Sequence, residues 1–155
     1  MIKLKKILFP TDFSESSQEA SRYALSFARE FKAKLVVLNV VNEKVFTEGL
    51  NLPRVISVEE LEKEMTEEGR KRLRTLYQAE EVEGVEWESV IKKGNPFLEI
   101  IRFAKEEDID LIIIGTHGHS GFEHIIFGST AEKVVRKAPC PVLSVRPSQR
   151  EFVMP

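Results

Sequence analysis

Short aliphatic runs alternate along this chain with longer stretches that have the period of a helix. Runs typical of buried strands cover residues 6–9, 35–41, 110–114 and 142–145. A fifth run, residues 85–92, alternates apolar and polar positions in its first half, as a half-exposed edge strand does. The pattern therefore predicts five strands separated by helices.

Capping residues and apolar spacing predict where the first two helices begin. Asp12-Phe13-Ser14-Glu15 fits a capping box before the first helix, with Ser14 or Ser16 as competing caps. The apolar face of this helix contains Ala20, Tyr23, Ala24, Phe27, Ala28 and Phe31. A second capping box, residues 57–60, opens a helix of about twenty residues, which Gly69 interrupts at a cost of about 1 kcal/mol relative to Ala.

Two further helices complete the alternation. Asn95 and Pro96 fit the N-cap and the first helical position of the third helix. The fourth helix follows Gly128 and extends to about Lys137. Residues 42–56 show no clean period, and loops of such length often have a function.

Strands that alternate with helices predict one open parallel α/β sheet with right-handed crossovers and helices on both faces. The most apolar strands belong in the middle and residues 85–92 at an edge, which a Rossmann-like strand order of 3-2-1-4-5 satisfies. This single domain is expected to cover residues 1–147, followed by a loosely held tail, residues 148–155. In such sheets ligands bind where the strand order switches, here between the ends of strands 1 and 4.

One of these strand ends is followed by a glycine-rich stretch, residues 115–130, that contains four of the eight glycines of the chain. Glycines let a backbone approach an anion closely, and the N–H groups at a helix start favour negative charge. The stretch has neither the G-x-G-x-x-G dinucleotide spacing nor the P-loop pattern with its lysine. The sequence predicts a phosphate cradle of another type, and glycines that only form tight turns are the alternative.

Composition narrows the function classes. The 155 residues carry a net charge of −2, which argues against a nucleic-acid or anionic-membrane binder that acts through bulk charge. The single cysteine, Cys140, excludes an intrachain disulfide and fits a reducing interior, and no apolar run has the length of a membrane helix. We therefore expect a cytoplasmic protein that binds neither nucleic acid nor membrane.

All three histidines lie in the glycine-rich stretch. His117, His119 and His124 form H-x-H-x4-H, which leaves a zinc site as an alternative. No carboxylate at ligand spacing or second cysteine accompanies them, so we expect no metal ligand from protein side chains alone.

The spacing Gly115-x2-Gly118-x9-Gly128-Ser129 resembles the signature of nucleotide-binding members of the universal stress protein family. The resemblance covers nearly the whole chain, because other segments match family segments in the same order: residues 6–14, 38–41, 111–118 and 141–145. The family contains members that bind ATP and members that do not, and the intact glycine motif is typical of the ATP-binding branch.

The resemblance implies a nucleotide site formed by Pro10, Thr11, Asp12, Val40, Gly115, Thr116, His117, Gly118, His119, Ser120, Gly128, Ser129 and Thr130. Residues 10–12 would border the adenosine, Val40 the adenine edge, and residues 128–130 the outer phosphates. Gly115 and Gly118 would let the loop pass close to ribose and α-phosphate. Asp12 is expected to face the base or ribose, with a role as helix N-cap only as the alternative.

The expected ligand is ATP with Mg²⁺ or Mn²⁺ held through its phosphates, with AMP or ADP as alternatives. The resemblance implies a nucleotide-dependent regulatory switch of the stress response, with no catalytic residues and at most slow or partner-dependent hydrolysis. It also implies a homodimer through the edge strand Val142–Val145, and an unidentified protein partner fits a switch of this kind. The rival interpretations are an adenine-nucleotide hydrolase or transferase on a related fold, and an interaction module whose glycine loop binds no nucleotide.

Overall fold

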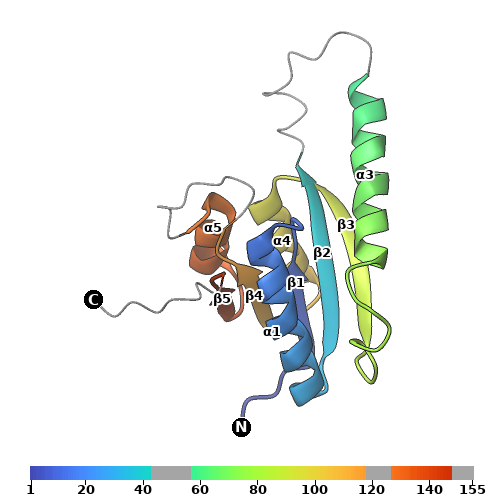
Figure 1. The fold of residues 1–155 in the computed structure, drawn as a ribbon. Helices are drawn as coiled ribbons and strands as arrows, with labels where there is room; N and C mark the ends of the chain where they lie inside the picture. The colour runs from blue at the N-terminus through green and yellow to red at the C-terminus, as the bar shows by residue number, and fades with distance from the viewer. Residues whose placement is uncertain (43–56, 118–126, 148–155) are drawn as a thin grey trace, which may run out of the picture.

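The computed structural model describes residues 1–42, 57–117 and 127–147, whose strands form one open parallel sheet (Figure 1). The sheet has five strands in the order β3-β2-β1-β4-β5, so the predicted order is confirmed, as is the edge position of β3. The elements are β1 Lys6–Pro10, α1 Glu15–Phe31, β2 Lys34–Asn42, α3 Val58–Arg74, β3 Trp87–Gly94, α4 Pro96–Glu106, β4 Leu111–Gly115, α5 Ser129–Lys137 and β5 Val142–Val145.

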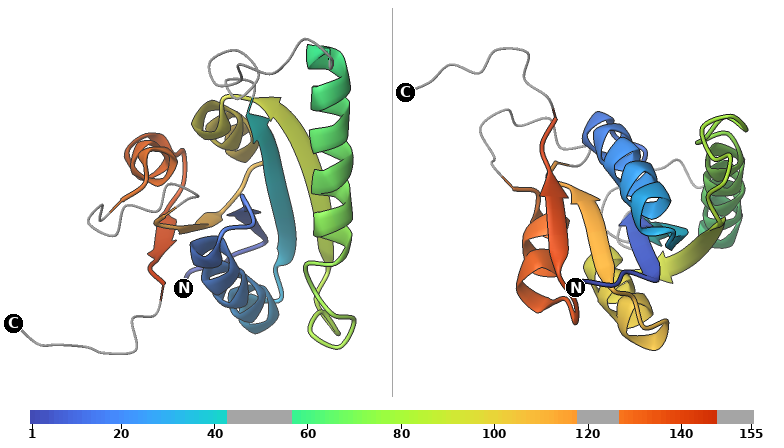
Figure 2. Two further views of the ribbon diagram at one scale, coloured as in Figure 1. Left: turned by 45° about the horizontal axis from the view of Figure 1, so that its top comes forward. Right: turned by 90° about the horizontal axis from the view of Figure 1, so that it is seen from below.

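Helices cover both faces of the sheet, with α1 and α3 on one face and α4 and α5 on the other (Figure 2). Successive strand side chains point to opposite faces, so Ile7 and Phe9 of β1 pack beneath α1, whereas Leu8 between them joins the core beneath α4 and α5. The central strands are mostly apolar because both of their faces are covered, and the buried Asn39 of β2 is an exception.

Helix α1 begins two residues later than a cap at Asp12 would place it. The N-cap is Ser14, whose hydroxyl accepts a hydrogen bond from the Ser17 N–H at 3.3 Å. The capping box predicted at Asp12–Glu15 is therefore wrong, and Ser16 is not the cap either. The second predicted box is confirmed, because the side chains of Ser57 and Glu60 cap each other's backbone N–H groups. At α4, Asn95 is the N-cap residue but makes no side-chain capping bond.

The apolar face of α1 is narrower than its pattern predicts. Ala20, Ala24 and Ala28 are buried against the sheet, whereas Tyr23 and Phe31 are 46% and 40% exposed. Small residues let the helix lie close to β1 and β4, which leaves the large aromatic side chains at its flank. Within the described ranges, no helix is both long and apolar enough to cross a membrane.

Candidate functional site

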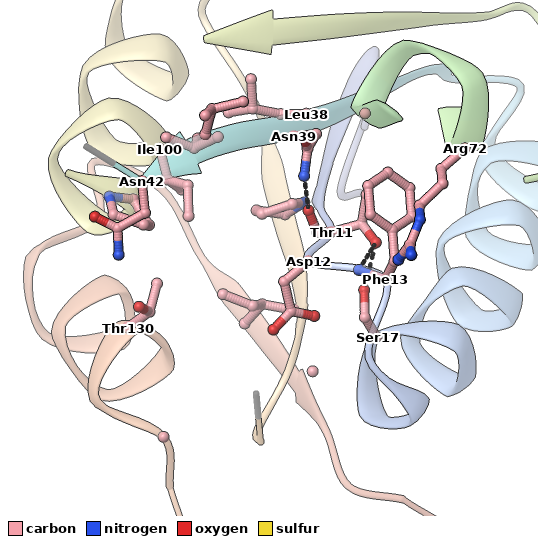
Figure 3. A pocket seen from close by; sticks show the side chains of 18 of the residues that line it. Thr11, Asp12, Phe13, Ser17, Leu38, Asn39, Asn42, Arg72, Ile100 and Thr130 are labelled. Carbon is pink, nitrogen blue, oxygen red and sulfur yellow. Dashed lines mark hydrogen bonds between the residues drawn. The ribbon is translucent and has the colours of Figure 1, made fainter. Parts of the chain in front are cut away.

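A cavity of about 710 Å³ lies at the carboxyl ends of β1, β2 and β4, where the strand order switches. Residues of α3 and of the starts of α4 and α5 also line it (Figure 3). The structure brings ten of the predicted site residues together in its lining: Pro10, Thr11, Asp12, Val40, Gly115, Thr116, His117, Gly128, Ser129 and Thr130. The other three, Gly118, His119 and Ser120, lie outside the described residues.

Thr11 forms the fixed centre of the first wall. Its N–H donates to the Leu38 carbonyl at 2.8 Å, and its own carbonyl accepts from the Asn39 side-chain amide at 2.9 Å. Its hydroxyl oxygen accepts from the Ser17 hydroxyl at 2.7 Å and from the Phe13 N–H at 3.0 Å. The N–H, the carbonyl and the hydroxyl oxygen of Thr11 are thus engaged by the protein, so we infer that Thr11 shapes the site and presents its neighbours to a ligand.

The next residue, Asp12, projects its side chain into the cavity (Figure 3). One carboxylate oxygen accepts a hydrogen bond from the Ser14 N–H at 3.0 Å, which fixes the direction of the side chain. Because Ser14 is the helix N-cap, a role for Asp12 as N-cap only is wrong.

Phe13 completes this turn in the left-handed region, with φ of 63°. A bulky residue rarely adopts this conformation unless its surroundings impose it. Here the bond from the Phe13 N–H to Thr11 and the Arg72 guanidinium, 5.6 Å from the centre of the Phe13 ring, hold the residue in place.

The second wall is built on Thr116, which is fully buried. Its N–H donates to the Val145 carbonyl of β5 at 2.9 Å, and its carbonyl accepts from the Gly128 N–H at 2.6 Å. Its hydroxyl lies 2.8 Å from Nδ1 of the His117 ring. The backbone N–H of His117 donates to the Ser16 hydroxyl at 3.1 Å. These bonds fasten the end of β4 to α1, β5 and the residue that precedes α5.

Helix α5 therefore begins at the cavity, with Gly128 as its N-cap and Ser129 and Thr130 in its first turn. The first N–H groups of a helix have no partner inside the helix, and its dipole makes this end attractive to anions. Gly128 has φ of −67° and ψ of 153°, an extended conformation open to any residue. Backbone conformation does not explain this glycine, whereas close approach of a ligand would.

Gly115 is required for a different reason from the one predicted. A Cβ on this residue would lie 2.8 Å from both the carbonyl oxygen and the hydroxyl oxygen of Ser16 in α1. The glycine thus allows β4 to pack against the start of α1, and its missing side chain faces a helix and not the ligand.

The third wall, α3, was not predicted as part of the site. It contributes Leu61, Glu64, Met65, Glu68, Gly69 and Arg72. The Arg72 guanidinium forms an ion pair with Glu68 at 2.9 Å and lies against Phe13. The sequence pattern predicts this helix, but it could not show where along β2 the helix lies.

The walls differ in the groups that they present to a ligand. On the β1 side, the Asp12 carboxylate can accept hydrogen bonds from hydroxyl or amino groups of a ligand. On the α5 side, backbone N–H groups and the hydroxyls of Ser129 and Thr130 donate to anions. The cavity therefore suits an elongated ligand that has hydroxyl or amino groups at one end and an anionic group at the other.

The zinc alternative finds no support in the described part of the chain. Residues 1–42, 57–117 and 127–147 contain no group of three or more His, Cys, Asp or Glu side chains that could hold a metal ion. His119 and His124, two members of the predicted set, lie outside these ranges. Cys140 is half-buried, and burial together with the nearby Asp110 carboxylate raises the pKa of its thiol.

Known proteins resemble this chain along most of its length. The sequence profile of the universal stress protein family matches residues 3–146. Universal stress protein MJ0531 from Methanocaldococcus jannaschii is 38% identical over 147 residues, which cover 95% of this chain and 85% of that protein.

Solved structures show the same architecture. Universal stress protein UspA from Lactobacillus plantarum superposes with a TM-score of 0.80 at 27% identity, over 94% of this chain and all of that chain. A universal stress protein from Archaeoglobus fulgidus in complex with dAMP has a TM-score of 0.55 at 24% identity, over 94% of this chain and 99% of that chain. At that identity, the second structure demonstrates a shared fold only.

Proposed function

This chain belongs to the universal stress protein family, and we propose that it binds ATP in the cavity between β1, β4 and α5 as a regulatory switch of the stress response. Asp12 would accept hydrogen bonds from the ribose or the base, and Val40 would border the adenine. Gly128, Ser129 and Thr130 would bind the outer phosphates through backbone N–H groups and hydroxyls. AMP or ADP would bind at the same place with fewer phosphate contacts. A cytoplasmic location, where ATP is available, is part of this proposal.

The observation that carries the proposal is the convergence of both predicted walls on one cavity into which a helix N-terminus opens. Ten residues from four separate parts of the sequence line this single space. The Archaeoglobus fulgidus protein was solved in complex with dAMP, so the shared fold can accommodate an adenine nucleotide.

The backbone N–H groups at the start of α5 fit phosphate oxygens and not a metal ion. Mg²⁺ or Mn²⁺ would therefore be held mainly by the nucleotide phosphates, as Mg²⁺ commonly is. Its charge would offset repulsion between phosphates, while the protein residues bind and orient the nucleotide. We propose that the site holds ATP and hydrolyses it slowly at most.

Calorimetric titration with ATP and Mg²⁺ tests this assignment, using Gly128→Val as the informative variant. The extended backbone of Gly128 accepts valine, so the added side chain should obstruct the phosphates without unfolding the protein. We expect ATP affinity to fall at least about tenfold, a loss of about 1.4 kcal/mol in binding free energy. Lys137→Val, which places the same side chain at the exposed far end of α5, should leave the affinity unchanged.

The rival functions predict other results in the same experiments. A wild-type chain that shows no binding up to about millimolar ATP would favour an interaction module and contradict this proposal. Product release faster than about 1 s⁻¹ from ATP and Mg²⁺ would instead favour a hydrolase or transferase. We further propose a homodimer formed through β5, which is an edge strand of the sheet.

A further inference from the structure

A buried amide on β2, Asn39, links helix α3 to the turn that carries Asp12. Asn39 lies on the strand face that α3 covers, and its side-chain N–H donates to the Thr11 carbonyl at 2.9 Å. Figure 3 shows this bond reaching from β2 to the residue immediately before Asp12. The amide thus fixes the peptide group from which the Asp12 side chain departs.

On its other side, Asn39 is confined by Gly69 of α3. A Cβ on Gly69 would lie 2.9 Å from the Asn39 side-chain oxygen and 3.4 Å from Cδ1 of Ile91. A separation of 2.9 Å is shorter than such contacts allow, and the end of the Asn39 side chain can move more easily than the backbone, so we expect a larger residue at position 69 to displace the amide. The glycine in the middle of α3 therefore provides the space in which Asn39 holds Thr11.

The remaining bonds of the turn depend on the same arrangement. The Thr11 hydroxyl accepts from Phe13 and Ser17 only while its backbone stays in place, and the left-handed Phe13 depends on the first of these bonds. Release of the Thr11 carbonyl would loosen one of the contacts that hold this uncommon backbone conformation.

We propose that Asn39 and Gly69 are positioning residues for the nucleotide, through which α3 sets the orientation of the Asp12 carboxylate. The inference rests on the proposed function, because it assigns Asp12 to the ribose or base of a bound nucleotide. It adds α3 as an element that controls affinity without touching the phosphates.

Gly69→Ala is the sharpest test, because it separates affinity from stability. Alanine favours a helix over glycine, so the gain within α3 should offset part of the loss at Asn39 and keep the thermal midpoint close to that of the wild type. Displacement of the Asn39 amide should raise the Kd for ATP about fivefold to tenfold, as the loss of one hydrogen bond would. Lys63→Ala, on the exposed side of α3, should change neither quantity.

A double-mutant cycle shows whether the effect passes through Asn39. Asn39→Ala should weaken ATP binding by itself, and Gly69→Ala should add nothing in that background because the amide is gone. An equal effect of Gly69→Ala in both backgrounds would overturn the role of Asn39.

Hydrogen exchange tests the linkage without any nucleotide. In Gly69→Ala the Phe13 N–H, which donates to Thr11, should exchange faster than in the wild type, while core amides of β1 stay protected. Unchanged exchange of this amide would overturn the linkage.

The ATP titrations separate the two proposals. If the wild type binds ATP and Gly69→Ala binds it with unchanged affinity, this inference alone is overturned. If the wild type does not bind ATP, the proposed function is overturned and, with it, the role assigned to α3.

Discussion

The glycines around the cavity serve different purposes, which only their surroundings distinguish. Gly115 packs against Ser16, whereas Gly69 makes room for Asn39. Gly128 has an ordinary extended backbone and begins a helix at the cavity. One residue type therefore supports strand packing, amide placement and ligand access within a single site.

Gly115→Ala should destabilise the fold itself. The added Cβ would lie 2.8 Å from the Ser16 carbonyl oxygen, and a backbone atom cannot move aside as the end of a side chain can. We expect a loss of about 1 to 3 kcal/mol in the free energy of unfolding, typical of overpacking, measured by urea denaturation.

A second variant identifies the contact that is responsible. Ser16→Ala combined with Gly115→Ala removes the clash with the hydroxyl but leaves the carbonyl, so most of the loss should remain. A Gly115→Ala protein with the wild-type urea midpoint would show that β4 and α1 are less tightly packed than we describe.

At the scale of elements, Tyr77, which follows α3, connects this part of the chain to α1 and to β3. The Tyr77 hydroxyl donates to the Ser21 carbonyl of α1 at 3.4 Å, and its ring meets Trp87 of β3 edge to face, with centres 5.5 Å apart. Burial raises the pKa of Tyr77 above its ordinary value of 10.0. The folded chain thus binds the phenolic proton more tightly than the unfolded chain does.

This raised pKa predicts a loss of stability in alkaline solution. The contribution of Tyr77 is fully present below pH 10 and falls as the pH rises further, by at most about 1.4 kcal/mol per pH unit. Tyr77→Phe should remove this part of the slope between pH 10 and 11 in urea denaturation. The other tyrosine, Tyr23, is 46% exposed, and Tyr23→Phe serves as the control for loss of a surface phenol. Equal slopes in wild type and Tyr77→Phe would contradict the assignment.

The sequence predicts the parallel sheet well because its strands carry strong, distinct signals. Continuous apolar runs require cover on both faces, and residues 85–92 alternate as an edge strand does. Once the order is known, the ends of β1 and β4 must meet, which is why residues 10–12 and 115–117 line one cavity.

Contacts between separate elements could not be predicted in the same way. The position of α3 along β2 depends on side-chain packing, so Gly69 is seen in the sequence as a cost to the helix and in the structure as space for Asn39. The side chains of Ser14 and Asp12 can both cap a helix, so the sequence leaves the N-cap open. In the structure Ser14 caps α1, and Asp12 accepts from the Ser14 N–H instead.

For the whole molecule, the cavity and the β5 edge are joined by one backbone bond. The Val145 carbonyl at the end of β5 accepts from the N–H of Thr116, which lines the cavity. A partner that pairs with β5 would therefore lie next to an element that holds the second wall. The dimer that we propose would bring two nucleotide sites into one assembly through this strand.

Backbone geometry identifies the groups of β5 that are available to a partner. The Pro141 and Val145 carbonyls point toward β4 and the loop after it, so the alternate residues Val142 and Ser144 direct their N–H and C=O groups to the open edge. Ser144→Pro removes one outward N–H without removing a bond to β4. A strand edge tolerates proline on this side, so the monomer should remain folded.

Sedimentation velocity distinguishes the outcomes, because a dimer has twice the 17.8 kDa mass of one chain. We expect the wild type to sediment as a dimer and Ser144→Pro as a folded monomer. Ser89→Pro is the matched control, because Ser89 is an exposed serine of β3, the opposite edge of the sheet. The Glu86 carbonyl accepts from Leu35 of β2, so residues 86, 88 and 90 point toward β2 and the Ser89 N–H points outward. If dimerisation uses β5, Ser89→Pro must stay dimeric. A wild-type monomer would contradict the proposed dimer. Dissociation by Ser89→Pro but not by Ser144→Pro would assign the interface to β3 and exclude pairing through β5.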